Sequence, residues 1–159
     1  MRFYLIDRIT ECLVGERATA LKAVSLSEDF MDTHFAGVPI MPGSMILEGM
    51  AQLAGYLLAR TVVPAAPHTH KALLSMVEKA KFMQVVQPGD TMTLECRIVA
   101  LGEDSAKVDG TASVGERKVA TARMLFSYHT IENKLLEANR REIFSIWTTG
   151  TSEPRTGAP

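Results

Sequence analysis

Residues 34–52 read HFAGVPIMPGSMILEGMAQ, a loop rich in proline and glycine that leads into an apolar segment. The loop ends at Pro42 and Gly43, and residues 45–60 contain no proline. We therefore expect one helix that begins near Gly43 or Ser44. Because this segment is apolar on nearly every side, it predicts a helix that the rest of the protein surrounds.

Glu48 and Gln52 interrupt the apolar segment. They are four residues apart, so they share one face of the helix and the Gln52 amide can hydrogen-bond the Glu48 carboxyl. No Lys or Arg lies between Lys22 and Arg60, so Glu48 has no local ion-pair partner. A carboxyl among apolar side chains must be hydrogen-bonded, paired or protonated. Glu48 is therefore the first candidate for a functional residue.

The loop before the helix adds a second candidate, His34. An imidazole can take or give a proton near neutral pH. The loop also ends at a helix N-terminus, where unpaired N–H groups and the helix dipole favour negative charge. A lone loop histidine is more often a surface residue, and a helix glutamate is more often paired with a cation. Together, however, His34 and Glu48 offer a base and an acid beside an oxyanion site.

The rest of the chain alternates in the way that strands do, with turns at Gly and Asp. This pattern around one long helix predicts the α+β class. A short helical turn is expected over 27–31. The predicted strands cover residues 3–14, 17–25, 72–86, 91–101, 107–114 and 118–128.

Composition limits the possible functions. The chain has 159 residues, of which 47% are hydrophobic, so it suits one domain with a full core. Its net charge of −1 argues against a nucleic-acid partner. A charge at Asp7 comes too early for a signal peptide, and no segment is long and apolar enough to span a membrane. We therefore expect a cytoplasmic protein.

The two cysteines and two of the histidines are residue types that can bind metals. Cys12 and Cys96 lie in predicted strands without CxxC spacing, which indicates two buried thiols. His68 and His70 form an H-x-H pair, but the loop around them holds no carboxylate or thiol. An exposed loop is therefore the favoured interpretation, and no metal site is expected.

The stretch 34–43, followed by 47–52, resembles the active-site signature of the hotdog-fold 3-hydroxyacyl-[acyl-carrier-protein] dehydratases of the FabZ type. The segments 79–82 and 86–90 are similar to the strand and turn that follow the central helix in this family. The resemblance extends over about residues 3–130. It implies a hotdog fold, in which a curved antiparallel sheet wraps around one long central helix.

The resemblance also implies the roles of the site residues. His34 would remove a proton from C2 of the substrate, and Glu48 would donate one to the departing C3 hydroxyl. The backbone N–H of Gly43 would stabilise the thioester oxyanion. The carbonyl of Ile40 would fix the histidine ring, and the Gln52 amide would orient the acid. This chemistry requires no metal and no nucleotide cofactor.

Members of the family are dimers whose sheets join edge to edge, and some form hexamers. The resemblance therefore implies a homodimer in which His34 of one chain and Glu48 of the other share each site. The substrate would arrive on the phosphopantetheine arm of an acidic acyl carrier protein. Candidate docking charges are Arg60, Lys71, Lys79, Lys81 and Arg123.

The chain divides into three parts on this interpretation. Residues 1–131 form the hotdog domain. Residues 132–147 predict an amphipathic helix that packs on this domain or on a neighbouring subunit, with docking of a partner as the functional alternative. Residues 148–159 are rich in Thr, Gly and Pro and predict a disordered tail.

Two other functions stay open on the sequence. A hotdog thioesterase would use a carboxylate and a helix N-terminus to hydrolyse the thioester. A non-catalytic acyl-binding or assembly subunit would keep the fold without the reaction. The presence of both His34 and Glu48 argues against the second alternative, because binding alone needs no acid–base pair.

Overall fold

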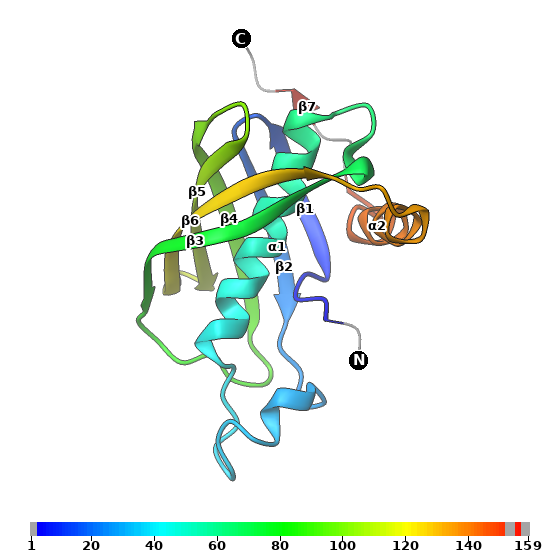
Figure 1. Cartoon of the computed structure of the whole chain (residues 1–159). Helices are drawn as coiled ribbons and strands as arrows, with labels where there is room; N and C mark the ends of the chain where they lie inside the picture. Colours follow the sequence, from blue (N-terminus) through cyan, green and yellow to red (C-terminus); the bar gives the residue numbers. More distant parts are fainter. Residues whose placement is uncertain (1–2, 152–154, 157–159) are drawn as a thin grey trace.

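The computed structural model describes residues 3–151 and 155–156, and its elements are arranged around the long helix α1 (Figure 1). The elements in chain order are β1 (Arg8–Val14), β2 (Arg17–Ala23), the 3-10 turn η1 (Asp29–Met31), α1 (Gly43–Val62), the 3-10 turn η2 (Pro67–Thr69), β3 (His70–Phe82), β4 (Thr91–Leu101), β5 (Ser105–Val114), β6 (Arg117–Thr130), α2 (Lys134–Trp147) and β7 (Arg155–Thr156).

Over the described residues the strands form one seven-stranded sheet in the order β3-β6-β5-β4-β2-β1-β7. Neighbouring strands are antiparallel, except that β7 runs parallel to β1. The sheet curves around α1, as Figure 1 shows. The predicted α+β hotdog fold is therefore confirmed.

The packing of α1 follows from its sequence. Its 20 residues extend over about 30 Å. The side chains of Met50, Leu53, Leu57 and Leu58 have 0% exposure and fill the concave side of the sheet. A Cβ atom on Gly110 of β5 would lie 2.9 Å from the Met50 sulfur and 3.2 Å from the Met50 Cβ, so glycine at this position lets the helix pack closely on the strand.

The central strands show the expected alternation of buried and exposed residues. In β5, every second residue from Ala106 to Ala112 is buried, and β4 alternates in the same way. Their buried positions face α1, while the opposite positions face away. In contrast, β3 is exposed along most of its length and lies at the edge of the sheet.

Two strand predictions are wrong at one end by four or more residues, and the other predicted bounds lie within two residues of the observed ones. The first strand begins at Arg8 rather than at residue 3, because the chain before it runs beside α1 and the Leu5 N–H bonds the Gln52 side chain. The strand predicted over 72–86 ends at Phe82. Beyond it, the carbonyl of Val86 accepts from the Met41 N–H, which draws the chain away from β6.

Helix α2 begins after Asn133, whose side chain accepts hydrogen bonds from the first turn of the helix. Its aromatic residues pack on the main body. Phe144 contacts Tyr56 of α1 edge to face at 4.9 Å, and Trp147 contacts Tyr4 at 6.2 Å between ring centroids. The helix thus lies beside α1 and the N-terminal segment (Figure 1).

The segment 148–159, predicted to be disordered, is only partly described. Within it, the Thr151 hydroxyl donates to the Ile9 carbonyl at 2.6 Å, and Arg155–Thr156 pairs with β1. These residues are therefore held by the first strand, which the prediction did not include. Residues 152–154 and 157–159 lie outside the described residues.

No helix in the described part of the chain is both long and apolar enough to cross a membrane.

Candidate active site

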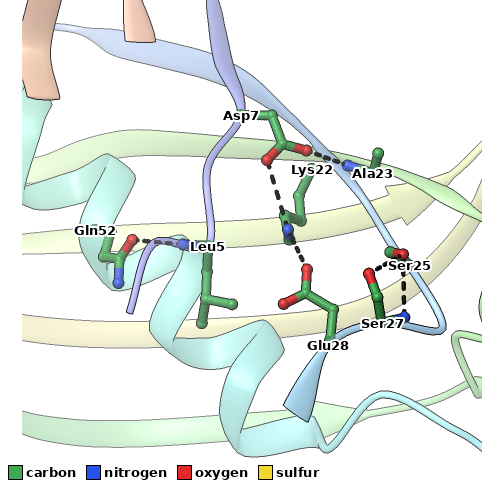
Figure 2. A network of polar contacts seen from close by, with 8 residues as sticks. All are labelled: Leu5, Asp7, Lys22, Ala23, Ser25, Ser27, Glu28 and Gln52. Atoms are coloured by element: carbon green, nitrogen blue, oxygen red, sulfur yellow. Dashed lines mark hydrogen bonds and ion pairs between the residues drawn. The ribbon is translucent and has the colours of Figure 1, made fainter. Parts of the chain in front are cut away.

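The Glu48 carboxyl is held by Gln52, one helical turn further along α1. The Gln52 Nε2 donates to Glu48 Oε1 at 3.0 Å and to the carbonyl of Phe3 at 3.1 Å. The Gln52 Oε1 accepts from the Leu5 N–H at 2.9 Å (Figure 2). Because a backbone N–H can only donate, this contact orients the amide so that its NH₂ group faces Glu48. Both ends of the amide are thus used to position the acid.

Glu48 and Gln52 lie in the wall of a cavity of about 450 Å³. The cavity is bounded by α1, the N-terminal segment, the start of β3 and one face of α2. A volume of this size is typical of small-molecule sites. Apart from the two α1 residues, the polar lining side chains are those of Tyr4, Tyr56, Lys71, Asn139, Arg140 and Trp147.

His34 lies in the loop between η1 and α1, and the chain there folds back on itself. His34 Nδ1 lies 3.2 Å from the Ile40 carbonyl oxygen, and the Ile40 N–H donates to the His34 carbonyl at 2.9 Å. Gly37 has a φ of +79°, which glycine adopts readily. Since a carbonyl oxygen can only accept, Nδ1 carries the proton, and in the neutral ring Nε2 then has the free lone pair. The ring is therefore oriented to act as a base through Nε2.

A buried lysine fixes the chain that leads into this loop. Lys22 is 6% exposed, and its ammonium group lies 2.5 Å from Glu28 Oε1 and 3.5 Å from Asp7 Oδ1. Asp7 also accepts from the Ala23 N–H at 2.6 Å. Figure 2 shows Lys22 between the two carboxylates. Glu28 directly precedes η1, so this network holds the start of the segment that carries His34.

Sequence reasoning missed Lys22 as part of the site, although a signal for it exists. In β2 the buried positions alternate through Ala18, Ala20 and Lys22. A lysine on the inner face of a strand must find a carboxylate, and that requirement points to a network.

Gly43 is the first residue of α1, so its N–H has no acceptor within the helix. A Cβ atom here would lie 2.8 Å from the ring of Phe82, at the end of β3. The predicted oxyanion site therefore has an aromatic ring packed against it. The sequence did not predict the contact with Phe82.

Within one chain the structure assembles these residues as two separate groups. Glu48 and Gln52 meet at the cavity, and His34 meets Ile40 in the loop. His34 is not among the described residues that line the cavity. The structure therefore does not bring the predicted base and the predicted acid together in a single chain.

The remaining candidates have structural surroundings. Cys12 and Cys96 are free and buried, as predicted; burial raises the pKa of the Cys12 thiol to about 11 and also raises that of Cys96. His70 is the first residue of β3, and His68 lies 2.9 Å from Arg141 Nη2, so neither lies in a simple exposed loop. Among the described residues, no three His, Cys, Asp or Glu side chains form a group that could hold a metal.

Comparison with known proteins identifies relatives of this chain. The family model of the FabA-like domain matches residues 1–123. The 3-hydroxyacyl-[acyl-carrier-protein] dehydratase FabZ of Clostridioides difficile is 36% identical over 128 residues, which cover 79% of this chain and 86% of that protein. The enzyme of the same name from Caldanaerobacter subterraneus is 39% identical over 125 residues, covering 78% of this chain and 86% of that protein.

Solved structures share the fold at low sequence identity. A hot-dog-like protein from Thermanaerovibrio acidaminovorans superposes with a TM-score of 0.61 at 21% identity, covering 84% of this chain and 93% of that one. The protein smu.793 from Streptococcus mutans, bound to acetyl CoA, has a TM-score of 0.61 at 16% identity, covering 79% and 90%. The family model matches most of this chain, and the FabZ relatives are more than 30% identical to it. The chain therefore belongs to the FabA-like family.

Proposed function

We propose that this protein dehydrates 3-hydroxyacyl thioesters carried on acyl carrier protein to trans-2-enoyl thioesters, in fatty-acid or related lipid or polyketide biosynthesis. The observation that carries the proposal is the Glu48 carboxyl, held by Gln52 in the wall of a cavity, in a chain whose relatives are named as such dehydratases. The reaction breaks a C2–H bond and a C3–O bond, forms the C2–C3 double bond and releases water.

His34 is the base in this mechanism. Its Nδ1–H faces the Ile40 carbonyl, so the lone pair of Nε2 is available to take the C2 proton. The electrons of the C2–H bond move toward the thioester carbonyl. The resulting negative charge lies on the carbonyl oxygen, where the N–H of Gly43 and the positive end of the α1 dipole stabilise it.

Glu48 is the acid. It gives its proton to the C3 hydroxyl, which leaves as water while the double bond forms. The Gln52 amide donates to one oxygen of the carboxyl, so the other oxygen is free to carry and deliver the proton. After one turnover His34 holds an extra proton and Glu48 lacks one. A proton must pass between them, directly or through solvent, before the next cycle.

A homodimer with shared sites accounts for the separation of His34 from Glu48. Strand β3 is the edge of the sheet, and several of its apolar side chains are exposed. An exposed apolar edge strand is a template for pairing with a second copy. We expect the two sheets to join along β3, so that the loop of one chain approaches the cavity of the other. Three such dimers would form the hexamer that some relatives adopt.

The partner that delivers the substrate is an acyl carrier protein, and we expect the reaction to take place in the cytoplasm. Of the candidate docking charges, Lys71 lines the cavity, whereas Arg123 is already paired with Asp109 through two hydrogen bonds of 2.7 Å. The structure thus favours Lys71 over Arg123 for contact with the substrate or its carrier.

The test is mass spectrometry of a 3-hydroxyacyl carrier protein incubated with wild type, His34→Ala and Glu48→Gln. We expect wild type alone to convert the substrate to a species lighter by one water, with a loss of about 10²- to 10⁴-fold in each variant. Release of the free carrier thiol would instead establish a thioesterase. An unchanged substrate at every acyl length would indicate a binding subunit.

Refolding the two inactive variants together tests the shared sites. A hybrid dimer of His34→Ala and Glu48→Gln contains one site with both wild-type residues, so random mixing should restore about a quarter of the wild-type activity. Sites built within single chains would give no recovery. Light scattering on the same samples distinguishes a dimer from a hexamer.

A further inference from the structure

The cavity that contains Glu48 has a cationic end that the dehydration mechanism does not use. Arg140 of α2 and Lys71 of β3 both line it. Arg140 Nη2 donates to the His70 carbonyl at 2.9 Å, which places the guanidinium at the peptide that joins His70 to Lys71. Two cationic residues are therefore neighbours at one end of a largely apolar cavity.

Neither cation has a counterion in the described part of the chain. No carboxylate there lies within ion-pair distance of Arg140 or Lys71, although Arg141, the next residue, is paired with Glu137. The Arg140 Nε is buried and has no hydrogen-bond partner among the described residues. Burial lowers the pKa of the Arg140 guanidinium. Arg140 therefore has one hydrogen-bond acceptor, the His70 carbonyl, and its other donors are available to an anion at this end of the cavity.

The Phe144 ring supports the guanidinium without neutralising it. The Arg140 Cζ lies 4.9 Å from the ring centroid, a cation–π contact that fixes the plane of the group. With one N–H donating to the His70 carbonyl and one face on the ring, the remaining N–H groups are left for a further acceptor. A planar guanidinium held in this way suits a carboxylate or a phosphate.

The distance from the acid can be estimated along α1. Gly55 lines the cavity, and a Cβ atom on it would meet only the Ala72 carbonyl, at 3.8 Å, so the cationic end lies at the level of Gly55. Seven residues separate Gly55 from Glu48, which corresponds to about 10 Å along the helix. An anion bound there would be about 10 Å from the carboxyl that acts on C3.

We propose that Arg140 and Lys71 form an oxyanion-binding subsite at the α2 end of the cavity, which takes an anionic group of the substrate. The inference rests on the proposed dehydratase function. The same chemistry could be supplied by a carboxylate at the far end of the acyl chain or by the phosphate of the prosthetic arm. The first source would make the protein selective for dicarboxylic acyl chains.

The test compares kcat/KM for 3-hydroxyoctanoyl carrier protein and for its ω-carboxy analogue. Wild type should prefer the ω-carboxy substrate by about ten- to hundredfold, the value of hydrogen bonds to a charged group. Arg140→Gln should abolish most of that ratio, and Arg140→Lys should retain part of it. The matched control is Arg141→Gln, because Arg141 is the adjacent, exposed arginine and does not line the cavity.

A second comparison identifies which group of the substrate supplies the anion. If Arg140 binds the phosphate of the arm, Arg140→Gln should raise KM equally for both acyl chains on phosphopantetheine and should not change KM for the same chains on pantetheine. That result supports the subsite with the prosthetic arm as its ligand. An equal ratio of kcat/KM in wild type and Arg140→Gln, with no dependence on the phosphate, would overturn the proposal.

A binding measurement needs no variant and no turnover. Suberate should raise the Tm of wild type more than octanoate does, because only the diacid can place one carboxylate at Arg140 while its chain fills the cavity. Equal shifts, together with a KM that does not depend on the phosphate, would overturn the subsite. If wild type dehydrates neither substrate yet suberate still stabilises it, the proposed reaction fails while the anion site stands.

Discussion

Glu48 and His34 are held in different ways. Glu48 lies on a rigid helix, and the amide that orients it is itself fixed by backbone groups of Phe3 and Leu5. His34 lies in a loop, and its ring is held by one contact to the Ile40 carbonyl. Two of its loop neighbours, Phe35 and Val38, are 58% and 57% exposed.

In the proposed dimer, this difference separates the part of the site that one chain completes by itself from the part that it does not. The proposed acid, Glu48, and its orienting amide are assembled within one chain. The proposed base, His34, is oriented locally, but the loop around it presents apolar side chains to solvent, as an interface segment does. The two halves should therefore respond differently to substitution and to dimer formation.

Among variants that keep both His34 and Glu48, the largest effect should come from Gln52→Leu, which removes the orienting amide. The Leu5 N–H then loses its acceptor and the Glu48 carboxyl loses its donor. Each unsatisfied group costs about 1–3 kcal/mol of folding free energy, so we expect a lower Tm. The same cost at a Glu48 carboxyl that is no longer oriented corresponds to a loss of about 10- to 100-fold in kcat. Steady-state kinetics and thermal unfolding measure both.

Gln84→Leu is the matched control, because Gln84 is exposed and lies two residues after the end of β3. It should leave kcat unchanged. If Gln52→Leu also kept full kcat, the acid would not depend on its amide, and the proposed contrast between the two regions would be wrong.

A smaller effect is expected from Lys22→Met, which acts on the loop. The variant leaves Asp7 and Glu28 without their shared cation. Both carboxylates are partly solvated, so the cost should be about 1–2 kcal/mol, below that of a fully buried pair. We expect a lower Tm and a fall in kcat/KM of up to about tenfold, since the chain that leads to His34 is loosened.

The double variant Lys22→Met/Glu28→Gln separates charge from packing. Removal of the Glu28 charge should recover part of the lost Tm, because the uncompensated carboxylate is gone. Lys22→Arg should recover part of the activity. Full activity in Lys22→Met would show that this network supports β2 and not the loop.

Much of this arrangement could be predicted from residues 34–52. The i, i+4 spacing of Glu48 and Gln52 predicts their contact, and the proline and glycine pattern predicts where α1 begins. What the sequence could not provide were contacts between distant segments. Leu5 meets Gln52 because the N-terminal segment leaves the sheet, and that departure depends on packing rather than on local propensity.

The same limit applies to the C-terminal helix. Its apolar periodicity predicts an amphipathic helix over 132–147, but the sequence could not say which side chains would reach the cavity. Arg140 reads as an ordinary surface arginine beside Arg141. Only the tertiary structure distinguishes them: Arg140 lines the cavity, and Arg141 is paired with Glu137.

Thiol labelling reports on the two regions without an activity assay. The Cys96 thiol donates to the Met50 carbonyl of α1 at 3.2 Å and is fully buried, and burial raises its pKa. A protonated, buried thiol reacts slowly. At pH 8, Cys96 of native wild type should therefore be labelled only when the structure around it opens. Gln52→Leu should accelerate labelling more than Lys22→Met does. An equal acceleration would mean that the two regions open together.

The smallest effect should come from Asp109→Asn, far from both regions. Asp109 and Arg123 form two hydrogen bonds of 2.7 Å across β5 and β6, and the Arg123 guanidinium lowers the pKa of the Asp109 carboxyl from its ordinary value of 3.8. A lowered pKa stabilises the folded state above the ordinary value, and this stabilisation is lost as pH falls through the folded-state pKa. Both side chains are largely solvated, so screening keeps the effect small.

Wild type should therefore have a slightly higher Tm than Asp109→Asn at pH 7, and this difference in Tm should disappear in acid. The kcat of the variant should equal that of wild type at every pH. A change in kcat would mean that the outer face of the sheet is coupled to Glu48 or His34, and the comparison would then have to include a third region.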